Sequence, residues 1–297
     1  MHLIPNLFGS MPPNACDVYK KLCAPDEYPK GQIVRQHCER LWRVFHPFAE
    51  PQFLTEFPLH FHQRWFEMYL TVTLLERGAD VQPTAPPGPD ILVIADGRRI
   101  WIEAVCGTGG QPGLPDSVVQ GSDVRVPWDK IALRVRSSIE EKKNKYEKYL
   151  QEGYVAADDS LLVALNVYEI PYALSDTPRY IFRALFGVGA QVIHFALGHR
   201  TPPRAVDSSY EQVQTIPKLS SGSLVGTQPF IDGSMASIAA CIASAHSAAS
   251  AAHKPPDFTV YPNLTAAAPW SARRLPLPHE WEFSQTAEGW TGGLISA

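Results

Sequence analysis

The sequence feature that most constrains the fold is a pair of short apolar runs, residues 91–95 and 100–105, that flank an Asp-Gly dipeptide at 96–97. Asp-Gly between two apolar runs is a strong signal for a β-hairpin. The second run carries Glu103 at its centre, between an isoleucine and an alanine. Because burying an unpaired charge is costly, a carboxylate at this place indicates a functional site.

Two further carboxylates accompany the hairpin. Asp90 follows a proline directly before the first run, and Glu67 lies in the segment 58–77, whose apolar residues recur at helical spacing. Hard cations such as Mg²⁺ prefer oxygen ligands, often one or two carboxylates together with substrate phosphate. The pattern therefore predicts metal-assisted cleavage of a phosphodiester. Two simpler interpretations stay open: Asp90 as an ordinary turn residue and Glu67 as an exposed helix residue.

Composition is that of an ordinary globular protein. The chain has 297 residues, enough for one large domain or two small ones, with 45% hydrophobic and 19% charged residues. Its net charge of −4 argues against a surface coated with basic residues. We expect no secretory signal and no membrane span, since no stretch reaches roughly 18 apolar residues. The five cysteines lack CxxC spacing, so reduced thiols in a cytoplasmic protein are expected.

Periodicity and turn residues divide the chain into alternating helices and strands, which predicts an α/β fold with a mixed central sheet flanked by helices. The first strong helix is predicted to have Pro58 in its first turn and Gly78 after its end. Helices are predicted at 32–45, 58–77, 130–154 and 181–187, and core strands near Val81 and at 91–95, 100–105, 161–167 and 190–197.

The last third of the chain is harder to interpret. Residues 198–229 are predicted to be mostly loop. Residues 234–252 fit either a helix or a strand followed by a helix, and their alanine content favours the helix. The proline-rich tail from Pro255 is predicted to wrap the surface. The expected organisation is an N-terminal helical extension at 1–57, an α/β core at 58–200 and a C-terminal extension at 201–297 packed on that core.

The order of elements and acids resembles the PD-(D/E)XK nuclease superfamily, which has the restriction-endonuclease-like fold. The chain is also similar to an uncharacterised bacterial branch of it that carries a Glu-Ala-Val strand and a Lys-rich helix. The main resemblance covers about residues 60–200 and rests on Trp65-Phe66-Glu67-Met68-Tyr69-Leu70, Pro89-Asp90 and Glu103-Ala104-Val105. The branch also matches, at lower specificity, Asn166, Lys218, Phe230 and Tyr261-Pro262-Asn263.

The resemblance implies a role for each acid. Asp90, Glu103 and the backbone carbonyl of Ala104 would bind one Mg²⁺ or Mn²⁺ ion, and Glu67 would bind or orient it. The superfamily places a lysine two residues after the glutamate, but Val105 stands there. Without that lysine, the charge that develops on the phosphate lacks its cation.

Some branches of the superfamily carry the lysine on the following helix, and here Lys142 in the helix 130–154 is the candidate. The resemblance then makes Lys142 catalytic, and the same helix would offer Arg134 and Lys145 to nucleic acid. Arginine clamps a phosphate through two hydrogen bonds, whereas lysine acts as a point charge. The alternative is a solvated helix face whose lysines pair with neighbouring glutamates.

The leading hypothesis is therefore a Mg²⁺- or Mn²⁺-dependent endonuclease that cleaves DNA, with a homodimer as an open option. Val105 favours an alternative, a catalytically degenerate protein that binds nucleic acid or a partner protein in a bacterial defence or toxin system. The sequence leaves the choice between DNA and RNA, the substrate sequence and the pathway open.

Overall fold

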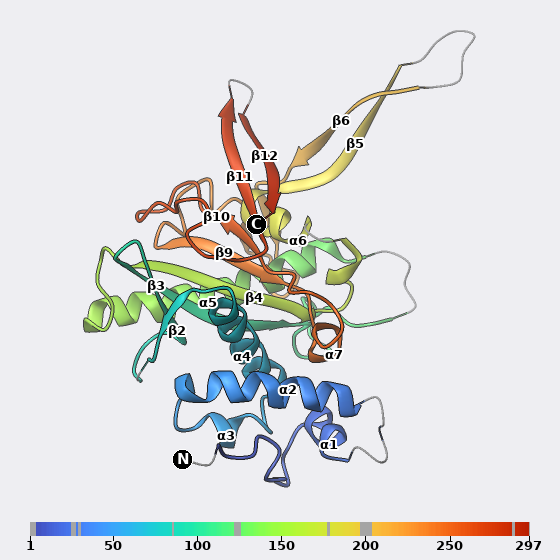
Figure 1. The fold of residues 1–297 in the computed structure, drawn as a ribbon. Helices are drawn as coiled ribbons and strands as arrows, with labels where there is room; N and C mark the ends of the chain where they lie inside the picture. Colours follow the sequence, from blue (N-terminus) through green and yellow to red (C-terminus); the bar gives the residue numbers. More distant parts are fainter. Residues whose placement is uncertain are drawn as a thin grey trace.

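The computed structural model describes residues 4–24, 28, 31–84, 86–121, 126–176, 179–196, 204–286 and 289–296. Its centre is an eight-stranded mixed sheet in the order β1-β2-β3-β4-β9-β10-β11-β12, with helices on both faces (Figure 1). The predicted α/β class with a mixed sheet flanked by helices is thus confirmed. Within the described residues, no helix is long and apolar enough to cross a membrane.

An N-terminal helical layer covers one face of the sheet. Its main helix, α4, packs against β3, and α2 packs on the other side of α4 (Figure 1). The helix predicted at 58–77 starts three residues later, because residues 57–60 form the turn that follows α3 and the Pro58 carbonyl accepts the Cys16 amide. The elements of this layer are α1 (Asp17–Cys23), α2 (Gly31–Phe45), the 3₁₀ turn η1 (His46–Phe48), α3 (Phe53–Glu56) and α4 (Phe61–Glu76).

The predicted hairpin joins β2 to β3 as an antiparallel pair. Asp96 and Gly97 both have positive φ, 51° and 72°, as the tight two-residue turn requires. β3 then runs beyond its partner: Ile102 is the last residue of β3 that pairs with β2, and the rest of β3 pairs only with β4. The strands are β1 (Asp80–Gln82), β2 (Ile91–Ala95), β3 (Arg98–Thr108) and β4 (Ser160–Glu169).

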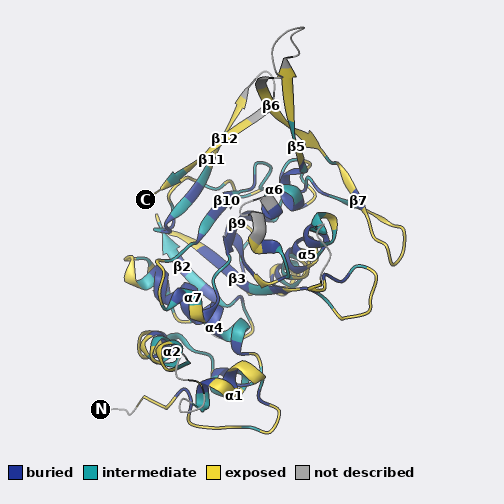
Figure 2. Ribbon diagram, turned by 90° about the vertical axis from the view of Figure 1, so that its right-hand side faces the viewer, coloured by how far each residue is buried: buried dark blue, intermediate teal, exposed yellow. Residues whose placement is uncertain are grey.

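The connection from β3 to β4 crosses over the second face of the sheet through α5 (Trp128–Glu152), which makes β3 and β4 parallel. Alternate residues of β3 and β4 pack against α4 and against α5, as the two-residue period of a strand requires. Figure 2 shows this double packing as a buried centre between α4 and α5. Trp101 belongs to the cluster on the α5 face, so Glu103, two residues on, lies on that face too.

The C-terminal third corrects two predictions. Of the two options for residues 234–252, the structure shows the strand followed by a helix: residues 238–244 form the fully buried strand β9, and the short α7 (Ala248–Ala251) follows it, whereas the alanine content favours a single helix. The helix propensity of alanine did not decide the structure here, because β9 lies between β4 and β10, where small side chains pack well inside the sheet. The tail is not a surface wrap, since it adds three strands to the sheet. The strands are β9 (Ile238–Ser244), β10 (Thr259–Pro262), β11 (His279–Thr286) and β12 (Gly289–Ser296).

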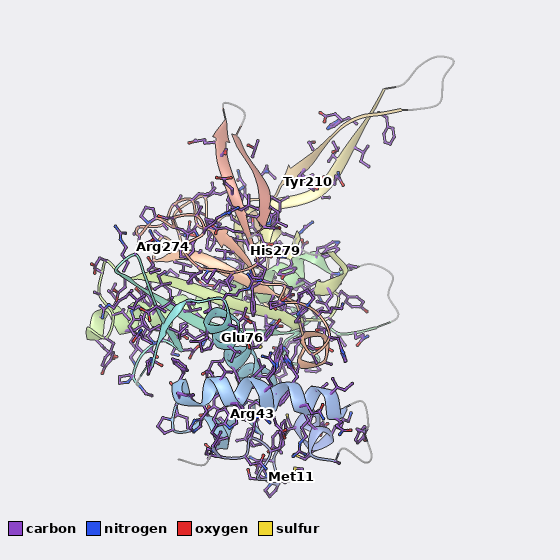
Figure 3. The ribbon with its side chains drawn as sticks, in the orientation of Figure 1. Met11, Arg43, Glu76, Tyr210, Arg274 and His279 are labelled. Carbon is purple, nitrogen blue, oxygen red and sulfur yellow. The ribbon has the colours of Figure 1, made fainter. Side chains whose placement is uncertain are left out.

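The strand predicted at 190–197 corresponds to β5, which lies outside the main sheet. Residue 197 is outside the described residues. Within the described residues β5 pairs with β6 alone, while β9 is the strand that follows β4 in the main sheet. The pair forms a ribbon that projects from the body, with Tyr210 on it (Figure 3). The region predicted to be mostly loop thus contains strands. These elements are η2 (Ala173–Asp176), α6 (Arg179–Phe186), β5 (Val188–Ala196), β6 (Arg204–Gln212), β7 (Thr215–Pro217) and β8 (Leu224–Gly226).

Candidate functional site

The candidate site is built around Glu103, whose side chain is completely buried in β3. Two lysines of α5 reach it: Lys142 Nζ lies 2.8 Å and Lys145 Nζ 3.1 Å from its carboxylate oxygens. Residues three apart lie on the same side of a helix, so one face of α5 delivers both ammonium groups. The pairing explains how an apolar strand tolerates a buried charge, because each charge offsets much of the cost of dehydrating the other.

Asp90 comes to the same place from the residue before β2. Its Oδ2 accepts a 2.8 Å hydrogen bond from the amide of Ala104, and Lys142 Nζ is 4.0 Å away. The Ala104 amide can donate this bond because β3 extends beyond the end of β2, so no residue of β2 pairs with Ala104. Asp90 is therefore more than a turn residue: it caps the open edge of β3 and brings a second carboxylate to Lys142.

Gln63, in the first turn of α4, completes this edge. Its side-chain amide donates to the Ala104 carbonyl (3.1 Å) and accepts from the Cys106 amide (2.8 Å). Gln63 thus takes the place of a neighbouring strand. The Ala104 carbonyl, predicted as a metal ligand, does face the carboxylate edge, and there it accepts the Gln63 amide. Sequence analysis does not point to this role of Gln63, because polar residues are common in a first helical turn.

Glu67 lies one turn further along α4 and is buried, with 3% of its surface exposed. The interpretation of Glu67 as an exposed helix residue is therefore wrong. Arg64 Nη1 donates to Glu67 at 2.6 Å, and the same guanidinium also binds Glu56. Burial, reinforced by the nearby Asp90 carboxylate, raises the pKa of Glu67 to about 8 despite the arginine.

The electrostatics join these groups into one cluster. Burial and the Asp90 charge raise the pKa of Glu103, while Lys142 and Lys145 oppose that rise. Burial alone would lower the pKa of Lys142, but Asp90 and Glu103 outweigh it and the net shift is upward. The ammonium of Lys142 is therefore fixed in its charged form between two carboxylates.

The cluster has some, but not all, features of a divalent-metal centre. Among the described residues, no three acidic, histidine or cysteine side chains are arranged to hold a metal ion. The predicted ligand set is smaller, however: two carboxylates and a carbonyl. Both carboxylate oxygens of Glu103 are buried beside an ammonium group, Oε2 at 2.8 Å from Lys142 Nζ and Oε1 at 3.1 Å from Lys145 Nζ. Asp90, Glu103 and the Ala104 carbonyl meet at one edge of β3, and each already has a protein partner with which a metal ion would compete.

The remaining predicted residues lie differently. Arg134 does not reach the carboxylates: its Nε donates to the carbonyl of Thr108, five residues beyond Glu103 on β3. Arg134 and Lys142 of α5 therefore contact β3 at two different points, Thr108 and Glu103. Lys145, predicted to contact nucleic acid, is a partner of Glu103 in this structure, and its contact with nucleic acid stays a prediction.

Sequence reasoning missed Gln63, Arg64 and Glu50. Burial raises the pKa of Glu50, and the charges of Arg64 and Asp90 act on it in opposite directions, which places it near the cluster. All three belong to segments that precede the hairpin: Arg64 meets Glu67 within α4, whereas Gln63 reaches β3 only because α4 packs on that strand. No family model, curated protein or solved structure matches this chain.

Proposed function

We propose that the cluster is the active centre of a metal-dependent enzyme that hydrolyses phosphodiester bonds in DNA, of the PD-(D/E)XK type with a migrated lysine. The observation that carries the proposal is Lys142, which reaches from α5 to the two carboxylates of the hairpin. The Val105 side chain cannot supply a cation. The ammonium of Lys142, which lies beside Asp90 and Glu103, would supply it instead. An antiparallel acidic hairpin followed by a helical crossover to a parallel strand supports a restriction-endonuclease-like core.

Each residue would have a definite role. Asp90, Glu103 and the Ala104 carbonyl would hold Mg²⁺ or Mn²⁺, which, when bound, polarises the phosphate and lowers the pKa of a bound water. Lys142 Nζ would donate hydrogen bonds to the phosphate oxygens as negative charge builds on them. Arg64 holds Glu67 in place through a 2.6 Å contact, and Glu67 would orient the groups around the ion from the α4 side.

Charge balance predicts that metal and nucleic acid support each other's binding. Asp90 and Glu103 are already balanced by the charges of Lys142 and Lys145. A divalent ion adds two positive charges to this balanced set, and the phosphates of a nucleic acid would compensate them. We therefore expect weak binding of Mn²⁺ alone and tighter binding in the presence of a DNA duplex.

A nicking assay on supercoiled plasmid with Mg²⁺ or Mn²⁺ tests the proposal. Wild type should cleave, Asp90→Asn and Lys142→Ala should not, and Lys148→Ala, which changes an exposed lysine of the same helix, should cleave as wild type. Calorimetry with Mn²⁺ should show binding that the double variant Asp90→Asn/Glu103→Gln loses. Cleavage by Lys142→Ala at the wild-type rate would reject the migrated lysine.

A second candidate function is a degenerate nucleic-acid-binding protein. The ion pair of Lys142 with Glu103 favours it, because an ammonium already neutralises the carboxylate that a metal would need. In this case the plasmid stays intact with either metal, while the protein still binds DNA in a salt-dependent way.

A further inference from the structure

A pocket lies where β4 and β9 end, and its lining shares no residue with the carboxylate cluster. Its volume is about 550 Å³, within the range of small-molecule sites. β4 and β9 are parallel, so their carboxyl ends meet at the same edge of the sheet. In open α/β sheets, ligands bind in crevices beyond the carboxyl ends of the strands. The position of the pocket is therefore that of a ligand site.

The walls of the pocket combine aromatic rings with a few polar groups. Tyr261 and Trp281 form a stacked pair on one wall, with ring centroids 6.4 Å apart. Tyr168 contributes a third ring and is 45% exposed. Tyr261 itself is buried, so the exposed Tyr168 ring, beside the partly exposed Trp281, is the surface that a flat, apolar ligand face could stack against.

The polar groups of the pocket are held in place by hydrogen bonds. Asp257 accepts from the Ser244 hydroxyl (2.6 Å) and from the Ala245 amide (2.7 Å), and His246 Nδ1 lies 3.6 Å from it. Each carboxylate oxygen can accept a further bond, so Asp257 and His246 offer an acceptor and an imidazole to the edge of a ligand. Lys254, an exposed residue, adds one positive charge to the lining.

A chain of contacts leads from this pocket to the carboxylate cluster. Gln63 holds the Ala104 carbonyl, and the neighbouring His62 ring lies 5.5 Å from the Tyr168 ring. His62 also contacts Asn166, whose amide donates to the His246 carbonyl at 2.8 Å. Glu103 pairs with Val163 on β4, and Tyr168 lies five residues further along that strand. Five residues at the spacing of a β-strand span roughly 17 Å, a distance that a short oligonucleotide covers.

We propose that the pocket binds a nucleotide unit, with the base against the aromatic wall, its polar edge at Asp257 and His246, and the phosphate near Lys254. Rings that stack bases and a cation that meets the phosphate are how proteins bind unpaired nucleotides. The inference rests on the proposed function for its preferred source of ligand, an unpaired nucleotide of the nucleic-acid substrate. A free nucleoside monophosphate has the same chemistry.

The test measures binding under conditions that prevent cleavage, with EDTA present. Calorimetry with the four nucleoside 5′-monophosphates and fluorescence anisotropy with a labelled single-stranded oligonucleotide and its blunt duplex provide the readouts. The variants are Tyr168→Ala, Tyr168→Phe and Lys254→Ala. Tyr154→Ala is the matched control, since Tyr154 is 44% exposed and lies after the far end of α5.

We expect single strand or monophosphate to bind wild type, with affinity about tenfold lower in Tyr168→Ala, the loss for one base–aromatic stack. Lys254→Ala should weaken binding several-fold, whereas Tyr168→Phe and Tyr154→Ala should bind as wild type. Binding of the monophosphates without preference for single strand over duplex identifies a free nucleotide as the ligand. Equal affinity of Tyr168→Ala and Tyr154→Ala for every probe, or no binding of any probe to wild type, overturns the inference.

Failure of this inference and failure of the proposed function are distinguishable. Plasmid cleavage by wild type, together with unchanged binding in Tyr168→Ala, would reject the pocket and leave the nuclease. An uncut plasmid, together with nucleotide binding that depends on Tyr168, would reject the nuclease and leave the pocket.

Discussion

Replacing Glu67 with glutamine should stabilise this protein above neutral pH and leave it nearly unchanged in mild acid. Glu67 has its pKa raised from 4.5 to about 8 by burial and by Asp90. A carboxyl whose pKa is higher in the folded protein than in the unfolded chain makes its full contribution to the free energy of unfolding below pH 4.5, where it is protonated in both states. This contribution is lost as pH rises through about 8, because the folded protein resists the ionisation that the unfolded chain allows.

The magnitude follows from the size of the shift. At 1.36 kcal/mol per pKa unit, a rise from 4.5 to about 8 gives an upper limit of about 5 kcal/mol in the free energy of unfolding. Arg64 stays within hydrogen-bond distance and would still donate to the carbonyl oxygen of a glutamine. Because the pKa of about 8 already includes the attraction of Arg64, we expect Glu67→Gln to gain at most about 4 kcal/mol relative to wild type between pH 5 and pH 8.5.

Urea unfolding followed by circular dichroism at pH 5 and pH 8.5 provides the measurement. Glu76→Gln is the control, since Glu76 lies at the end of the same helix, is half-exposed and pairs with Arg40 on the surface. Its effect on the free energy of unfolding should be small and alike at both pH values. If Glu67→Gln destabilises the protein equally at both pH values, then Glu67 is ionised throughout and the reasoning is wrong.

Three further predictions concern the edge of β3. Lys142→Ala should lower the free energy of unfolding by about 2–4 kcal/mol because it removes a partner of a buried carboxylate, and adding Glu103→Gln should restore most of that loss in a double-mutant cycle. Gln63→Ala should cost about 1–3 kcal/mol, since two backbone groups of β3 lose their partner, and hydrogen exchange at Cys106 should accelerate with it. Arg134→Ala should weaken DNA binding and reduce its salt dependence without abolishing cleavage; an unchanged salt slope would show that Arg134 serves only the Thr108 carbonyl.

The sequence by itself determined the parts of this protein that depend on near neighbours. The hairpin lies where Asp96-Gly97 predicts it, because a two-residue turn with positive φ at both positions is a local property. Glu103 was recognisable as a special residue because its six-residue context is apolar. The basic helix was placed within two residues at each end, since its periodicity is also local.

Tertiary structure alone decided which distant segments share the sheet and the site. Residues 238–244 became a central strand against their helix propensity, because a place beside β4 buries both faces of a strand. Arg134 and Lys142, although on one helix, separated because β3 runs along α5 and meets them at different points. Gln63 reached the edge of β3 only because α4 packs on β3, and no local signal records its contact with Ala104, which is 41 residues away in the chain.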